Sequence, residues 1–103
     1  MSQNPLVTAV ITTYKREPEI VVRAAKSVLN QTYKNLELIV VNDYPEGKEL
    51  VQKLAQALNE LGDSRIRYIC HEKNSGACAA RNTGIMNGNG EFVALLDDDD
   101  EWM

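Results

Sequence analysis

The chain has 103 residues, of which 44% are hydrophobic and 25% are charged, and its formal net charge is -4. This length suits one domain with its own core, and the acidic balance argues against a nucleic-acid partner. The sequence shows no signal peptide, no apolar run of membrane-spanning length and no CxxC pair. We therefore expect a cytoplasmic protein with two reduced thiols.

Apolar, β-rich segments alternate along the chain with segments of helical periodicity. Strands are predicted at residues 6–12, 36–41, 65–70 and 92–96, and helices at 18 to about 30, 50–61 and 77–86. In the last helix the small residues Ala77, Ala80 and Gly84 recur at helical spacing, which permits close approach to a sheet. The order βαβαβαβ predicts an α/β fold: a mostly parallel, open, Rossmann-like sheet with helices on both faces.

An acidic cluster follows the last predicted strand. The run Phe92-Val93-Ala94-Leu95-Leu96 carries no charge and predicts a strand buried on both faces, and four aspartates, 97–100, come directly after it. Carboxylates that repel one another at a strand tip suit a divalent cation, which prefers hard oxygen ligands. The alternative is that these acids open a helix, because acidic residues are favoured at helix N-termini.

The strand ends predict where a ligand binds. In a parallel sheet they share one edge, which brings Thr12 and Tyr14, Asp43, the loop after Cys70 and the aspartates near Asp97 together. Such an edge suits a nucleotide diphosphate bridged by a metal. Asp43 could accept a hydrogen bond from a base, or it could form an Asx turn before Pro45.

Other polar residues near this edge allow two interpretations each. Tyr14 could stack on a base or pack against the first helix, and Arg81 could pair with a phosphate or be a solvated cation. The turn 74–76 could offer backbone N–H groups to an anion, but it matches neither GxGxxG nor a P-loop. His71 has no partner at metal-ligand spacing and is interpreted as an ordinary loop histidine.

Five segments, in order, have a family resemblance. Residues 10–16 (VITTYKR), 27–33 (SVLNQTY), 38–43 (LIVVND), 74–77 with 80–85 (NSGA and ARNTGI) and 90–102 (GEFVALLDDDDEW) resemble the signature segments of the family 2 glycosyltransferases. The resemblance spans nearly the whole chain. It implies the GT-A fold, a nucleotide-diphospho-sugar donor (usually a UDP-sugar), Mn²⁺ or Mg²⁺, and an inverting transfer.

The resemblance also implies roles for individual residues. The DxD motif falls on Asp97-Asp98-Asp99, with Asp99 and Asp97 as metal ligands and Asp97 or Asp98 near the ribose or the metal's waters. Asp43 would read the base. The implied lining of the nucleotide pocket is Thr12, Tyr14, Arg16 and Arg81.

The resemblance places the catalytic base and the acceptor site C-terminal to Met103. Residues 1–103 are therefore expected to be the N-terminal donor-binding part of a longer enzyme, inactive alone, whose carbohydrate or lipid-linked acceptor could bring it to the inner face of a membrane. One departure is Tyr44-Pro45-Glu46, where the family more often has Gly-Ser. Three rivals remain: a nucleotidyltransferase, disfavoured because no glycine follows the first strand, a flavodoxin-like receiver, and a structural module.

Overall fold

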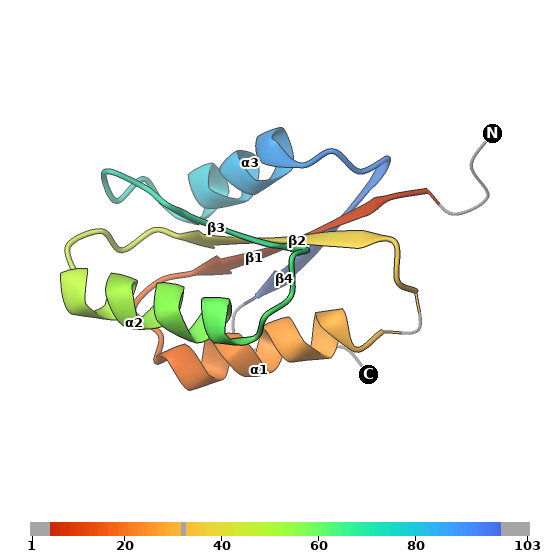
Figure 1. Ribbon diagram of the computed structural model, residues 1–103. Helices are drawn as coiled ribbons and strands as arrows, with labels where there is room; N and C mark the ends of the chain where they lie inside the picture. The colour runs from red at the N-terminus through yellow and green to blue at the C-terminus, as the bar shows by residue number, and fades with distance from the viewer. Residues whose placement is uncertain (1–4, 32, 98–103) are drawn as a thin grey trace.

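All seven predicted elements are present in the computed structural model, which describes residues 5–31 and 33–97 (Figure 1). The predicted boundaries agree with the observed ones to about two residues. The elements are β1 (Val7–Thr13), α1 (Pro18–Leu29), β2 (Leu36–Asn42), α2 (Lys48–Glu60), β3 (Ile66–Cys70), α3 (Ala77–Asn87) and β4 (Phe92–Asp97).

The strands form one parallel sheet in the order β3-β2-β1-β4. Helices α1 and α2 cover one face of the sheet and α3 covers the other, which confirms the predicted α/β architecture (Figure 1). Side chains of β1 alternate between the two resulting cores: Ala9 and Ile11 belong to the core under α1 and α2, and Val10 belongs to the core under α3.

Helix α3 packs closely on the sheet because it presents small residues to it. Ala80 is fully buried beside Val10, and a Cβ atom built on Gly84 would lie only 2.3 Å from Cγ1 of Val10. A side chain at position 84 would therefore push α3 away from the sheet. The small-residue spacing predicted this contact correctly for Ala80 and Gly84, whereas Ala77 lies at a cavity above the strand ends.

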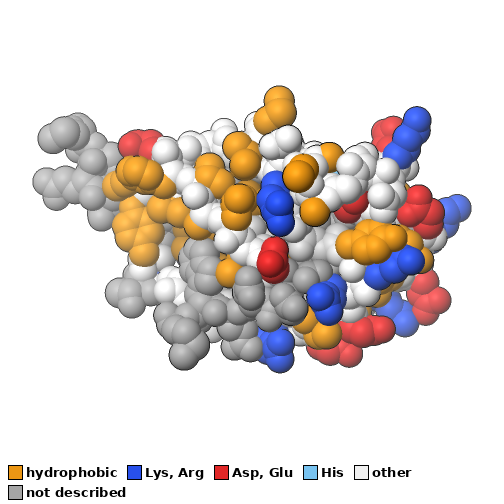
Figure 2. All heavy atoms as spheres, turned by 180° about the vertical axis from the view of Figure 1, so that it is seen from behind, with side chains coloured by type: hydrophobic (Ala, Val, Ile, Leu, Met, Phe, Trp, Pro, Cys, Tyr) orange, Lys and Arg blue, Asp and Glu red, His pale blue; other side chains and the backbone are white. Residues whose placement is uncertain are grey.

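The prediction that residues 92–96 form a strand buried on both faces is wrong. β4 lies at the edge of the sheet, where Phe92, Val93 and Leu95 are 59%, 43% and 50% exposed, and only Leu96 is buried. Hydrophobic side chains gather on this side of the molecule (Figure 2). A short apolar run has no periodicity that would distinguish a central strand from an edge strand. Within the described residues, β4 is an edge strand whose faces are largely uncovered.

Just before β3, Asp63 and Arg65 connect their own turn to the end of α1 and to the loop before β2. Arg65 forms a bidentate pair with Asp63, at 2.9 Å (Nε–Oδ1) and 2.7 Å (Nη2–Oδ2), and also donates to the carbonyls of Leu29 and Lys34. The hydrogen bonds from Arg65 lower the pKa of Asp63 to about 2 from 3.8.

We expect Asp63→Asn to destabilise the fold by about 1 kcal/mol at neutral pH. Because the folded pKa of Asp63 is depressed, its stabilisation is present above pH 3.8 and is lost as the pH falls toward 2. Urea unfolding between pH 2 and pH 7 should show the wild type and the variant converging in acid. Glu49→Gln, which breaks the exposed Glu49–Lys53 pair, is the control and should change little. Equal destabilisation by both variants would contradict this account.

Candidate functional site

The carboxyl ends of three strands meet at one edge, as the parallel order requires. In the sheet register Thr12 of β1 pairs with Asp97 of β4, and Thr13 pairs with Asn42 of β2. The chain runs from β1 outward to β3 and then returns to the other side of β1, so the direction of winding reverses between β1 and β4. Such a reversal opens a crevice in which α/β proteins bind ligands.

A cavity of about 550 Å³ lies at this edge. Its volume falls in the range of small-molecule sites. The cavity brings together every predicted site residue that the structure describes: Thr12, Tyr14, Arg16, Asp43, Arg81 and Asp97. The lining residues that the sequence did not single out as site residues are Thr13, Asn74, Gly76, Ala77 and Ala80.

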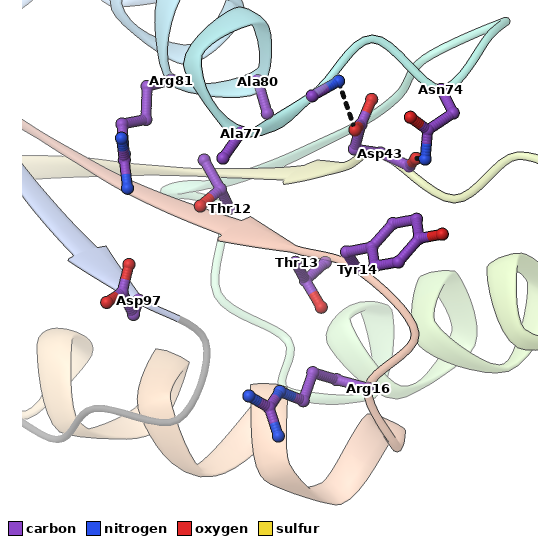
Figure 3. Close-up of a pocket in the computed structure, with 11 residues that line it drawn as sticks. Thr12, Thr13, Tyr14, Arg16, Asp43, Asn74, Ala77, Ala80, Arg81 and Asp97 are labelled. Carbon is purple, nitrogen blue, oxygen red and sulfur yellow. Dashed lines mark hydrogen bonds between the residues drawn. The ribbon is translucent and has the colours of Figure 1, made fainter.

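The cavity has two chemically different ends (Figure 3). Tyr14, Asp43 and Asn74 lie at one end, beside the loop before α3. At the other end Arg81 extends from α3 toward the side on which Asp97 lies, at the tip of β4. An end with an aromatic ring, an amide and the Asp43 carboxylate is thus separated from an end that holds both a cation and a carboxylate.

The Asp43 carboxylate is buried and accepts hydrogen bonds from a neighbouring loop. Oδ1 accepts from the Ser75 amide at 2.8 Å and lies 2.7 Å from Nδ1 of His71, and Oδ2 accepts from the Gly76 amide at 2.8 Å. Burial raises the pKa of Asp43, but the hydrogen bonds from Ser75, His71 and Gly76 outweigh it, so the net pKa is lowered. Asp43 is therefore ionised at neutral pH.

The hydrogen bonds in this region answer two questions that the sequence left open: what the amides of the turn at 74–76 bind, and whether Asp43 forms an Asx turn. The turn at 74–76 does offer backbone N–H groups to an anion, but the anion is the protein's own Asp43, so the Ser75 and Gly76 amides are already engaged. The Asx turn before Pro45 is made by Asn42, whose Oδ1 accepts from the Tyr44 amide at 2.9 Å. The Asp43 side chain faces the loop and the cavity instead.

Aromatic residues stand at the rim of the cavity. The rings of Tyr14 and Tyr44 meet edge to face, with centroids 5.3 Å apart, and Tyr14 remains 46% exposed. Lys15 lies over both rings and turns the chain through a left-handed conformation with φ of 55°. Tyr44, at the point where the chain departs from the pattern it resembles, thus packs against Tyr14, which lines the cavity.

The predicted metal ligands are only partly within the described residues. Asp97 lines the cavity and supplies hard carboxylate oxygens, whereas Asp98 and Asp99 lie outside the described ranges. Among residues 5–31 and 33–97, no three acidic, cysteine or histidine side chains gather as a metal site. The donor type at Asp97 fits a divalent cation.

His71 is the residue that the sequence analysis missed. Its ring joins Asp43 to Thr83 of α3, with Nε2 2.7 Å from the Thr83 hydroxyl. A single histidine with no partner at metal-ligand spacing does not by itself indicate these two contacts. The position directly after a predicted strand end was the only sign that its ring could reach the site.

The fold defines an α/β domain of the Rossmann-like, GT-A class, with a cavity at the strand ends. The chain belongs to glycosyl transferase family 2, whose model matches residues 8–103. It is therefore part of a transferase family, as the sequence resemblance implied.

Two relatives and one solved structure illustrate the match. The chain is 46% identical over 102 residues to a protein of Escherichia coli (strain K12) named as the colanic acid biosynthesis glycosyl transferase WcaA, covering 99% of this chain and 35% of that protein. It is 38% identical over 98 residues to the UDP-Glc:alpha-D-GlcNAc-diphosphoundecaprenol beta-1,3-glucosyltransferase WfgD of Escherichia coli, covering 95% of this chain and 36% of the relative. The chain thus spans about a third of these relatives.

The solved structure supports the fold. A mannosyltransferase from Pyrobaculum calidifontis, in complex with GDP-Man and Mn²⁺, superposes with a TM-score of 0.75 at 24% identity, covering 98% of this chain and 29% of that one. In the part of the chain that is described, no helix is long and apolar enough to cross a bilayer.

Proposed function

We propose that this chain is the donor-binding part of a longer glycosyltransferase that moves a sugar from a UDP-sugar to an acceptor hydroxyl with inversion, in the presence of Mn²⁺ or Mg²⁺. The observation that carries the proposal is the cavity at the strand ends, because it joins an end lined by an exposed ring and hydrogen-bonding groups to an end that holds Arg81 and Asp97. A nucleoside diphosphate has the same two-part chemistry.

The nucleoside would occupy the end with Tyr14 and Asp43. Tyr14 is exposed enough to stack on a base, and Asp43 is an ionised acceptor for a ring N–H. Thr12, from the neighbouring strand tip, would contact the ribose. Arg16 follows β1 and lines the same cavity.

The diphosphate would occupy the end with Arg81 and Asp97. Arg81 would pair with a phosphate oxygen. Asp97, together with Asp99 and with Asp98 nearby, would hold the divalent cation, which neutralises charge on the departing nucleoside diphosphate. The residues of this chain therefore bind the donor and orient its leaving group, and a carboxylate base elsewhere in the enzyme would take the acceptor's proton.

The relative that acts on a diphosphoundecaprenol substrate supports a lipid-linked acceptor. An enzyme of this kind would work at the inner face of a membrane. A carbohydrate acceptor would require no such location, so a sedimentation assay with vesicles that carry the lipid acceptor would separate the two.

The first test is calorimetric titration of the protein with UDP in the presence of Mn²⁺. We expect binding that EDTA abolishes, and an affinity about tenfold lower in Arg81→Met, because a charged hydrogen-bond partner of the diphosphate is lost. Lys26→Met removes the same charge from α1, away from the cavity, and should bind as the wild type does. A folded wild type that binds no UDP, or binds it equally well in EDTA, would contradict the proposal.

A further inference from the structure

His71 is held on two sides between the nucleotide end of the cavity and helix α3. Its ring lies 2.7 Å from Asp43 Oδ1 through Nδ1 and 2.7 Å from Thr83 Oγ1 through Nε2, and its side chain is 12% exposed. Its main-chain amide also donates to the carbonyl of Asn42 at 3.0 Å, which extends the strand pairing beyond β3. The ring therefore has little freedom to reorient.

The proton between His71 and Asp43 can be assigned. The Asp43 carboxylate can only accept, so Nδ1 of His71 carries the hydrogen. The Thr83 hydroxyl also lies 3.0 Å from the Ala79 carbonyl, and its single proton points either there or to Nε2. In both arrangements Nδ1–H faces Asp43.

The contacts also determine which oxygen of Asp43 remains open to a ligand. A carboxylate has about four acceptor positions, two on each oxygen. On Oδ1 both are taken, by the Ser75 amide and by His71. On Oδ2 one is taken, by the Gly76 amide, which leaves one acceptor position at the cavity (Figure 3).

We propose that His71 is a positioning residue for base selection: by occupying Oδ1 it fixes the Asp43 carboxylate so that Oδ2 accepts the ring N–H of a uracil base. This inference rests on the proposed function of the cavity. A base such as cytosine, which presents an acceptor at the same ring position, meets the carboxylate's negative charge instead. His71 thus supports selectivity for the base without touching the nucleotide.

Three substitutions separate the two contacts of the ring. The amide nitrogen of His71→Asn can take the place of Nδ1 and keep the hydrogen bond to Asp43, whereas His71→Gln reaches the Nε2 position and keeps only the Thr83 contact. Thr83→Val has the shape of threonine and removes the contact to α3 while leaving Asp43 and His71 together.

UDP and CDP share ribose and diphosphate, so the ratio of their affinities, measured by calorimetry with Mn²⁺, isolates the base contact. We expect His71→Gln to weaken UDP binding about tenfold and to leave CDP binding unchanged, and His71→Asn and Thr83→Val to keep the wild-type ratio. Circular dichroism checks that each variant is folded. A purely structural histidine would lower both affinities by the same factor.

The outcomes distinguish this inference from the proposed function. If the wild type binds UDP with Mn²⁺ but His71→Gln keeps the UDP-to-CDP ratio, or loses both nucleotides equally, the role of His71 is refuted and the donor site stands. If the folded wild type binds neither nucleotide, both are refuted. Because His71 is the only histidine in the chain, ¹⁵N labelling of histidine gives one Nδ1 signal, which should show a protonated nitrogen that shifts in Asp43→Asn.

Discussion

Replacing Asp43 by alanine is expected to destabilise the fold by about 3 kcal/mol and to weaken UDP binding more than a hundredfold. The substitution leaves the Ser75 amide, the Gly76 amide and Nδ1 of His71 without their shared acceptor, at hydrogen bonds that are partly buried. Each unmet donor costs about 1–3 kcal/mol, reduced where water can enter. Urea unfolding and calorimetric titration measure the two losses.

The acid side of the stability curve offers a second check on Asp43. Because its folded pKa is lowered, the stabilisation by Asp43 is present above pH 3.8 and is lost as the pH falls below that value, so the wild type and Asp43→Ala should converge in acid. Glu46→Ala removes an exposed carboxylate from the same loop and should alter neither stability nor binding. Equal effects of the two substitutions would show that the hydrogen bonds of Asp43 contribute nothing.

Adding a single methyl group at Gly84 is expected to destabilise the protein by about 2 kcal/mol. Alanine is the better helix former by about 1 kcal/mol, but overpacking a filled core costs about 1–3 kcal/mol or more. The new Cβ would meet Cγ1 of Val10 at 2.3 Å and Cγ2 at 3.0 Å, and Val10 is fully buried, so it cannot turn aside. Thermal unfolding of Gly84→Ala measures this cost.

The double variant with Val10→Ala identifies the cause. Val10→Ala removes both methyl groups that the new Cβ meets, so Gly84→Ala should cost little or become favourable in that background. The two effects would then be strongly non-additive. Additive losses would mean that the effect of Gly84→Ala arises elsewhere in α3.

The order of elements could be predicted from the sequence because each has a period of its own. Apolar residues of α1 and α2 recur every three to four positions, and the strands are rich in β-branched and other apolar residues. Parallel pairing then places Thr12, Asp43 and Asp97 at one edge without any knowledge of side-chain contacts. These three residues line the cavity, and so does Arg16, which only the family resemblance had indicated.

Contacts between distant loops could not be predicted in the same way. The partners of Asp43 come from residues 71–76, a segment without periodicity. This segment meets Asp43 because the chain after β3 lies against the end of β2. Neither His71 nor the backbone amides at 75 and 76 have a local pattern that indicates their acceptor. The edge position of β4 was missed for a related reason, since burial of a strand depends on which elements cover it and not on its own residues.

The central place of β1 has a consequence for how the protein is made. On a ribosome, β1, β2 and β3 can pair as they emerge, because each lies beside the strand synthesised before it. The second neighbour of β1 arrives much later, when Phe92 comes to lie opposite Val7 and Asp97 opposite Thr12. The described part of the cavity is therefore formed only once β4 has paired with β1, and a ligand that bound there would stabilise only chains in which this pairing is in place.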